Sequence, residues 1–267
     1  LYVDGTLTQS NGTLNTSTNN YDIYANNLSQ TAGTLTPNSS SITVDSASSQ
    51  TFQAASSLYD LDIGDTLKRG LVGHWQMDEG ADNTCSGGED VCDSTANANH
   101  GTIQGGDSDE WVAGAPTLTY TNDYAMEFDG SDDYVDLGSN AHDFTGDFTV
   151  SIWFNRDSTA NDDGLFGDIN TTNVYRWNSN ATDFFVRTEL DQSNTFSFTA
   201  HNASEWNHFV LLRSSGTLRA YLNGTESSTG GIGDSGNVGI DRIGKSHTVS
   251  WHDGKLDDVR IYNRALT

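Results

Sequence analysis

Residues 205–224 read EWNHFVLLRSSGTLRAYLNG, and this stretch decides the fold class. Two runs in which apolar residues recur flank the short polar turn SSGT, and the second run ends in Asn-Gly, a strong turn signal. Phe209, Leu211, Leu218 and Tyr221 are the candidates for the core or its margin. The stretch therefore predicts two antiparallel strands.

The same pattern continues along the chain from Leu71 onward. About twelve short strand-like segments, separated by Asn, Asp and Gly turns, follow one another at the spacing typical of two packed antiparallel sheets. None of these segments has a sustained helical period. Because one apolar sheet face must be covered by another, we expect an all-β sandwich. Trp75, Trp153 and Trp206 fall in these segments, so we expect all of them to pack in the core.

The charge balance excludes two classes of partner. The 267 residues include 37 Asp and Glu but only 12 Lys and Arg, for a formal net charge of −25. Nucleic acid is excluded because its phosphates must be neutralised by Lys and Arg, and an anionic membrane surface is disfavoured for the same reason. No run of apolar residues is long enough to insert in a membrane. The acidic excess is consistent with calcium ligands or with a surface adapted to high salt.

Cys85 and Cys92 lie in one loop, DNTCSGGEDVCDS, and form neither a redox motif nor a zinc motif. We expect a local disulfide, with two free thiols as the alternative. A disulfide implies an oxidising compartment, so we expect an extracellular or cell-surface protein. The chain begins at Leu1 without a Met or a leader pattern, from which we expect a processed product or a fragment.

Residues 1–68 differ from the rest in composition and contain a repeat. VDGTLTQSNGTLNT from Val3 recurs as ANNLSQTAGTLTP from Ala25, with Leu28 following Leu7 by 21 residues. Such a repeat predicts rungs of a β-solenoid, which are stable only when stacked. Self-assembly through this repeat is one expected consequence. A polar stalk with little fixed structure is the alternative.

The chain from Gly70 to Thr267 resembles a known family. Six sequence motifs occur in the order usual for laminin G-like domains of the concanavalin A-like superfamily. They are GLVGHWQMDEG, DSTANANHGTI, AMEFDGSDDYVDLG, DFTVSIWF, EWNHFVLLRSSGTLRAYLNG and DGKLDDVRIYNRALT. The resemblance implies a jelly-roll sandwich over residues 69–267, preceded by the repeat segment of residues 1–68. It also implies a binding or adhesion module rather than an enzyme.

Members of this family often hold a structural Ca²⁺, which ties the first strand region to the last. By resemblance, the metal residues here are Asp78 and Asp257 or Asp258, with Asp93 and the backbone of DSTANANHG as helpers. Carboxylates and carbonyls are the oxygens that Ca²⁺ prefers. The alternative is that Asp257 and Asp258 pair with Arg260 or Arg264, or face water.

A second acidic segment, EFDGSDDYVD, raises the question of catalysis. Glu127, Asp129 and Asp132 imitate the paired carboxylates of the glycoside hydrolases that share this superfamily. Gly130 and Ser131 interrupt the strand, however, and a turn does not hold two carboxyls at a fixed distance across a sugar. We therefore expect no catalytic residues. Asp129, Asp132, Asp133 and Asp136 remain a second set of cation ligands or an ordinary polar turn.

Aromatic and polar side chains on strand segments are the candidates for ligand contact, because sugars stack on rings and hydrogen-bond through hydroxyls. These candidates are Tyr175, Trp177, Phe185, Arg187 and Trp251. Since side chains alternate along a strand, we expect part of the set to face outward. The expected ligand is a carbohydrate or a cell-surface protein. A structural subunit of a filament or surface layer is the second reading, and a glycoside hydrolase the third.

Overall fold

The computed structural model divides the chain into two compact units, Leu1–Gly70 and Leu71–Thr267. It describes residues 2–10, 13–15, 23–30, 34–36, 41–44, 60–63, 70–106, 110–114, 116–118, 122–138, 142–158, 163–168, 176–179, 182–187, 193–199, 203–234, 236–246 and 250–266. These residues form strands, turns and loops and no helix. They accordingly include no helix long and apolar enough to cross a membrane.

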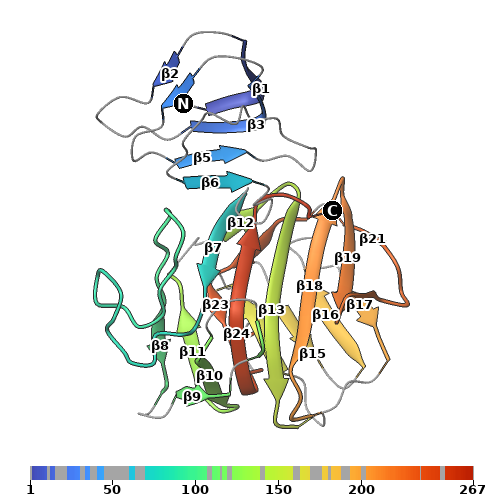
Figure 1. Ribbon diagram of the computed structural model, residues 1–267. Coiled ribbons are helices and arrows are strands. Elements are labelled where there is room, and N and C mark those ends of the chain that lie inside the picture. Colours follow the sequence, from blue (N-terminus) through green and yellow to red (C-terminus); the bar gives the residue numbers. More distant parts are fainter. Residues whose placement is uncertain are drawn as a thin grey trace. The chain divides into compact units, whose positions relative to one another are not determined.

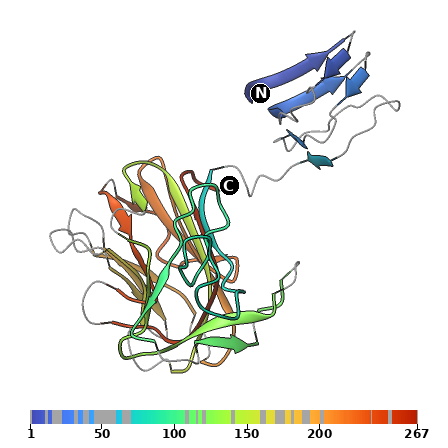
Figure 2. The same cartoon turned by 90° about the vertical axis from the view of Figure 1, so that its left-hand side faces the viewer.

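The second unit is a sandwich of two antiparallel sheets (Figures 1 and 2). The nine-stranded sheet contains, in spatial order, β20 (Thr225–Glu226), β19 (Thr217–Leu222), β18 (Asn207–Ser214), β13 (Phe148–Arg156), β24 (Asp253–Tyr262), β10 (Tyr124–Asp129) and β9 (Trp111–Ala113), with β21 (Ile232–Gly233) beside β19 and β7 (Leu71–Trp75) beside β24. The seven-stranded sheet contains β17 (Ser193–Ser197), β16 (Asp183–Arg187), β15 (Arg176–Ser179), β14 (Asp163–Gly167), β23 (Arg242–Ile243), β11 (Tyr134–Asp136) and β8 (Thr102–Gln104). A separate pair joins β12 (His142–Phe144) to β22 (Val238–Ile240). The predicted all-β sandwich is confirmed.

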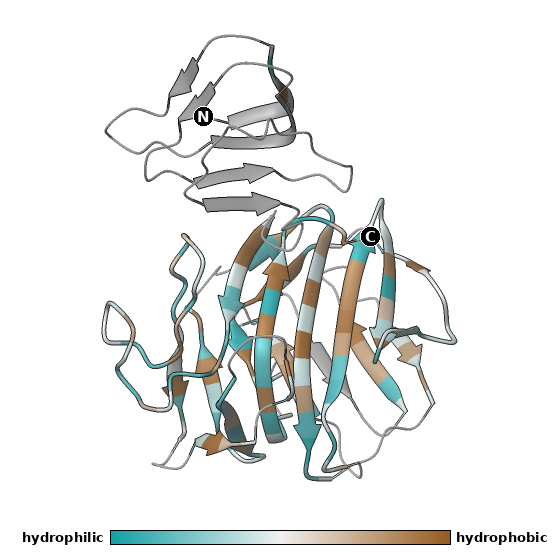
Figure 3. Cartoon of the chain, viewed as in Figure 1, coloured by the Kyte–Doolittle hydropathy of each residue, from teal (hydrophilic) through white to brown (hydrophobic). Residues whose placement is uncertain are grey.

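Alternating apolar side chains fill the space between the sheets. In β13, the side chains of Phe148, Val150, Ile152 and Phe154 are all fully buried. Figure 3 shows hydrophobic and hydrophilic bands alternating along the strands of the front sheet. Phe184 of β16 stacks on Phe209 of β18, with ring centroids 4.1 Å apart, and so joins one sheet to the other. Period-two burial of this kind is what two facing sheets require.

The prediction that three tryptophans pack in the core is correct for only one of them. Trp75 is fully buried in the core cluster. Trp153 lies on the outer face of the nine-stranded sheet, where its ring stacks on His208 at 4.9 Å. Its neighbours Ile152 and Phe154 point inward, so alternation turns Trp153 outward. Trp206 is half-buried and donates from Nε1 to the carbonyl of Gly114.

A β-bulge in β24 turns two consecutive carboxylates away from the core. Trp153 pairs with Asp257 and Ser151 with Arg260, so one residue of β13 faces two of β24. The extra residue, Asp258, has a φ of 44°. Leu256 and Val259 on either side both remain fully buried in the core. The bulge therefore lets Asp257 and Asp258 lie together outside the sandwich core.

The first unit consists of parallel strands stacked in chain order. One sheet contains β1 (Tyr2–Gln9), β3 (Ile23–Gln30), β5 (Ser41–Val44) and β6 (Asp60–Ile63), and a second pair joins β2 (Thr13–Asn15) to β4 (Thr34–Thr36). Leu7 pairs with Leu28 and Leu14 with Leu35. These are the partners that the sequence repeat aligns. Parallel rungs stacked in chain order are the architecture of a β-solenoid.

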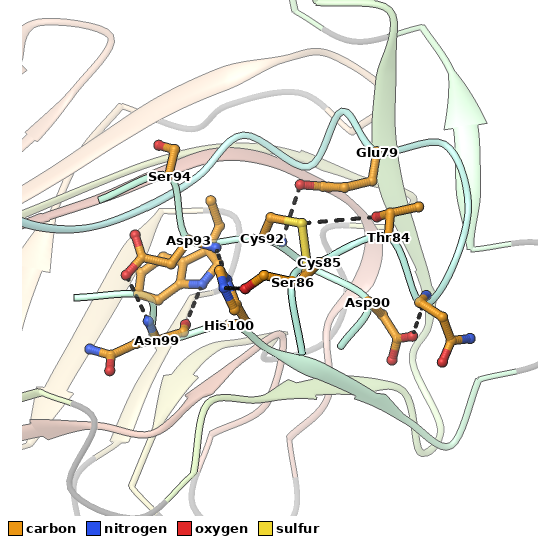
Figure 4. The surroundings of a disulfide bond; sticks show 12 residues. Glu79, Thr84, Cys85, Ser86, Asp90, Cys92, Asp93, Ser94, Asn99 and His100 are labelled. Atoms are coloured by element: carbon orange, nitrogen blue, oxygen red, sulfur yellow. Dashed lines mark hydrogen bonds between the residues drawn. A yellow bond between two sulfur atoms is a disulfide. The ribbon is translucent and has the colours of Figure 1, made fainter. Parts of the chain in front are cut away.

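Cys85 and Cys92 form the predicted disulfide, which fastens the loop between β7 and β8 (Figure 4). The carboxylate of Glu79 accepts a hydrogen bond from the Cys92 backbone at 3.1 Å. Asp93, which follows Cys92 in the sequence, is only 4% exposed and forms an isolated β-bridge with Trp75. The disulfide loop is therefore anchored directly to the first strand of the sandwich.

Candidate functional site

An open pocket of about 440 Å³ lies in the second unit. Its volume is within the range of small-molecule sites. The lining residues come from β7, from the loop after it, from β12 and from the segment after β24: they are Val72, Asn97, Asn99, His142, Asp143, Phe144 and Asn263.

The carboxylate of Asp93 holds the loop that forms one wall of the pocket. It accepts four hydrogen bonds, from His74 N, Thr95 N, Thr95 Oγ1 and Asn99 N, at 2.9 to 3.0 Å. Trp75 Nε1 donates to the Asn99 carbonyl at 2.9 Å (Figure 4). In the same loop, the side chain of Asn97 donates a hydrogen bond from Nδ2 to the carbonyl of Val72 at 2.8 Å. The wall is thus built before any ligand arrives.

His142 lines the pocket and is only 5% exposed. Its ring meets Trp75 edge-on at 5.5 Å and stacks on Phe144 at 6.1 Å. A Cβ on Gly73 would lie 2.9 Å from His142 Nε2 and closer still to the Trp75 ring, so only glycine fits there. His142 Nε2 is buried and has no hydrogen-bond partner.

Burial keeps the His142 ring neutral. Desolvation lowers its pKa from 6.5 to about 4, although the charges of Asp93 and Asp241 oppose the shift. A neutral imidazole offers one N–H donor and one nitrogen acceptor. A buried polar atom without a partner costs about 1–3 kcal/mol, so the packing around His142 offsets this cost elsewhere in the fold.

The chemistry of the pocket suits a small polyhydroxylated ligand. Val72 and Phe144 supply apolar surface, while the amides of Asn97 and Asn263 both donate and accept. The single carboxylate, Asp143, disfavours an anion. Hydroxyl groups, which also donate and accept, match such a lining. Sequence reasoning selected none of these side chains as ligand contacts, because they come from four separated segments.

The four predicted metal residues lie in two different settings. Asp93 is occupied by the four loop hydrogen bonds described above. Asp258 is held at 2.9 Å by His74 Nε2 and at 3.0 Å by Arg260 Nε, which is the arginine pairing considered as the alternative. Both oxygens of Asp93 therefore accept hydrogen bonds from the loop, and Oδ1 of Asp258 pairs with His74 and Arg260.

Asp78 and Asp257 form the other setting. Asp78 Oδ1 accepts from the backbone N–H groups of Asp123 and Tyr124, and Asp257 is fully buried beside them. Burial raises the pKa of Asp257 to about 7, and the nearby charges of Asp258 and Asp78 act in the same direction. A buried carboxyl close to a second carboxylate favours either a proton or a cation.

Asn122 completes this setting. Its Nδ2 lies 2.8 Å from Asp257 Oδ2 and 3.1 Å from the Pro116 carbonyl, while its Oδ1 is buried without a partner. If the amide were turned by 180°, Oδ1 would lie beside Asp257 Oδ2 and the Pro116 carbonyl, where it could ligate a cation. Asp78, Asp257, Asn122 and the Pro116 carbonyl therefore fit the oxygen ligands that Ca²⁺ prefers.

The second acidic segment, EFDGSDDYVD, forms the end of β10 and the turn after it. Asp129, Asp132 and Asp133 bring one oxygen each within 4.8 Å of one another. Asp129 Oδ1 accepts from Ser131 N at 2.7 Å, which is an ordinary turn contact. Glu127 pairs instead with Lys255 at 3.2 Å. The carboxylates of this segment thus stabilise the turn or form an ion pair on the surface of the sheet.

The predicted ligand-contact residues that the structure describes lie on the adjacent strands β15 and β16 and in the loop after β23. Tyr175 lies outside the described residues, and Trp177 in β15 pairs with Phe166 and Val186. Phe185 and Arg187 of β16 alternate with fully buried neighbours and are half-buried on the outer face of the seven-stranded sheet. Trp251 forms an isolated bridge with Lys245 between β23 and β24.

The comparison with protein families identifies the fold family. The family model Laminin_G_3, described as the concanavalin A-like lectin/glucanases superfamily, matches residues 129–267. The chain belongs to this family. The match begins later than the resemblance at Gly70, but the strands before residue 129 pair within the same sandwich. A search of curated proteins found no match.

Solved structures share the lectin-like fold at low identity. Domain 4 of AbnA, a GH43 extracellular arabinanase from Geobacillus stearothermophilus in complex with arabinotriose, is 17% identical, with a TM-score of 0.51 over 74% of this chain and 94% of that chain. The binding domain of botulinum neurotoxin DC in complex with SialylT is 11% identical, with a TM-score of 0.52 over 74% of this chain and 48% of that chain. This chain therefore spans about half the length of the toxin structure. Likeness at this level shows the fold alone.

Proposed function

We propose that the second unit is an extracellular carbohydrate-binding module and that its pocket holds a neutral sugar unit. The observation that carries this proposal is the open pocket, which combines the amides of Asn97 and Asn263 with the apolar surface of Val72 and Phe144. The two structural neighbours named above were solved with arabinotriose and with SialylT, which supports a saccharide as the ligand class. The disulfide supports a location outside the cell.

A sugar ring matches both kinds of surface in the pocket. Its C–H face packs on apolar side chains such as Val72 and Phe144, and its hydroxyls exchange hydrogen bonds with Asn97, Asn263 and Asp143. The neutral state of His142 is suited to this role, since one ring nitrogen accepts and the other donates. No step of catalysis is needed, and Asp143 is the one carboxylate among the described residues that line the pocket.

A glycan array of neutral oligosaccharides, followed by calorimetry with the best hit, tests the pocket. We expect Asp143→Ala and Asn263→Ala each to weaken binding by about tenfold, because each removes a hydrogen-bonding group from an exposed position in the wall. Thr225→Ala, on exposed strand β20, is the matched control and should change nothing. Unaltered affinity in both pocket variants, with unaltered melting temperatures, would remove this site from consideration.

We also propose that Asp78, Asp257 and Asn122 hold a structural Ca²⁺. Adding Ca²⁺ to EDTA-treated protein should raise the melting temperature by several degrees, since a ligand that binds only the folded state stabilises it. Asp257→Asn should abolish this shift. Asp129→Asn, in the acidic turn, should retain it. An unchanged wild-type melting temperature at low salt, or loss of the shift only in Asp129→Asn, would contradict the assignment.

Self-assembly of the first unit is the second candidate function. In the described part of that unit, β1 is at the end of its parallel sheet and pairs only with β3. An unpaired edge presents N–H and C=O groups on which another strand can add. Sedimentation velocity over a range of concentrations distinguishes the two functions. Growth of long assemblies without any glycan signal would favour a structural subunit.

A further inference from the structure

We infer that Tyr134, Arg242, Lys245 and Trp251 form a separate site for the carboxylate of an acidic sugar. Tyr134 belongs to β11 and Arg242 to the neighbouring strand β23. Lys245 and Trp251 face each other across an isolated bridge in the following loop. None of these residues lines the pocket around His142, so the two sites are independent.

Two cations converge on one ring at this place. Lys245 Nζ lies 4.2 Å from the centroid of the Tyr134 ring, and Arg242 Cζ lies 5.3 Å from it. Lys245 Nζ is also 5.0 Å from the Trp251 ring. Only 12 of the 267 residues are Lys or Arg, so a shared ring for two of them is a concentration of positive charge on a strongly acidic protein.

No described carboxylate forms an ion pair with either cation. Among the described residues, neither Arg242 nor Lys245 has a carboxylate within salt-bridge distance. Burial lowers the pKa of Lys245, and the charge of Arg242 adds to this shift, while the charges of Asp132 and Asp136 oppose it. Asp136 is also the cross-strand partner of Arg242. A bound anion would relieve the repulsion between the two cations.

Two buried donors at the site also lack acceptors. Arg242 Nε and Trp251 Nε1 are both buried and have no hydrogen-bond partner. A carboxylate offers two acceptor oxygens, and charge-assisted hydrogen bonds to it are stronger than neutral ones. The half-buried rings of Tyr134 and Trp251 add surface on which a pyranose can pack. A single carboxylate is preferred over a polyanion, because the net charge of −25 repels the latter.

The indole N–H signal of Trp251 reports directly on this site. In ¹H–¹⁵N spectra of the full chain, glucuronate should move that signal downfield, since a free N–H gains an acceptor. Trp251→Phe identifies the signal by removing it. Glucose should leave it in place, and sodium sulfate should move it less than glucuronate does. Raising the ionic strength should weaken the effect, as expected for an ion-pair contact.

Variants separate this site from the pocket and from nonspecific charge. Lys245→Gln and Arg242→Gln should each weaken glucuronate binding by about tenfold at unchanged melting temperature. Arg219→Gln, an exposed arginine on β19, is the matched control and should bind normally. Asp143→Ala should also bind normally, so a failure of the pocket proposal would not affect this result.

Three outcomes would overturn the inference. The first is a Trp251 signal that does not respond to glucuronate. The second is an equal response to glucose, which would make the site one for neutral sugars. The third is an equal or larger response to sulfate, which would show a general anion site rather than one for an acidic sugar.

Discussion

Asp163→Ala is expected to lower the free energy of unfolding by about 3–5 kcal/mol, because it removes a carboxylate that pairs with a fully buried guanidinium. Arg156 ends β13 and Asp163 begins β14, and Arg156 Nε pairs with Asp163 Oδ2. Their side chains are 0% and 2% exposed. Water cannot reach Arg156 to replace the lost partner. Urea unfolding followed by tryptophan fluorescence measures the change.

The chain contains a matched control for this result. Arg219 and Glu226 form an ion pair of the same chemical type, but their side chains are 44% and 38% exposed. Glu226→Ala should therefore change the unfolding free energy by less than about 1 kcal/mol. Similar small losses in both variants would show that the Arg156 site admits water and that its burial does not govern stability.

Acidification is expected to destabilise the wild type relative to His252→Leu by about 2.5 kcal/mol between pH 7 and pH 4.5. His252 is fully buried against Phe128, and burial together with the charge of Arg156 lowers its pKa from 6.5 to about 3. The unfolded chain therefore takes up the proton first as the pH falls. The stability associated with neutral His252 is complete above pH 6.5 and is lost progressively below it.

Comparing the two proteins isolates this one residue. Groups such as Asp257, whose raised pKa acts with the opposite sign, are present in both and cancel in the difference. The unfolding free energy is measured by urea titration at each pH. NMR of the His252 ring should show the neutral form at pH 4.5. Parallel pH profiles of wild type and variant would contradict the expected effect.

The strands and their facing could be predicted from the sequence because they depend on local alternation. Phe148, Val150, Ile152 and Phe154 occupy alternate positions of one strand, and all four line the core as that pattern requires. The same alternation, applied to Trp153, would have placed it outside. The prediction that Trp153 lies in the core was wrong because it was based on the residue type and not on the position of Trp153 in the alternating pattern.

The repeat and the disulfide were also accessible from the sequence. The 21-residue repeat aligned Leu7 with Leu28, and the parallel register pairs the same residues. Cys85 and Cys92 had only each other as partners. In each case the relevant residues are close in the chain or identical in spacing, so no knowledge of the long-range packing was needed.

The proposed calcium site could be predicted only in part from the sequence. The words containing Asp78 and Asp257 were found by resemblance, but Asn122 was not. The bulge at Asp258 changes the phase of β24, so alternation alone could not show which aspartate faces the second carboxylate. Asp93, chosen as a helper, instead organises the loop through backbone hydrogen bonds.

By itself, the sequence determined the sandwich, the stacked repeat and the disulfide, since polarity at period two and repeat spacing act between near neighbours. Only the tertiary structure brought Asn97, His142 and Asn263 into one pocket and set Lys245 beside Tyr134. Whether a buried nitrogen has a partner, and whether a cation has a counter-ion, depends on which distant segments pack together. That packing is a property of the whole fold and is absent from any single stretch of residues.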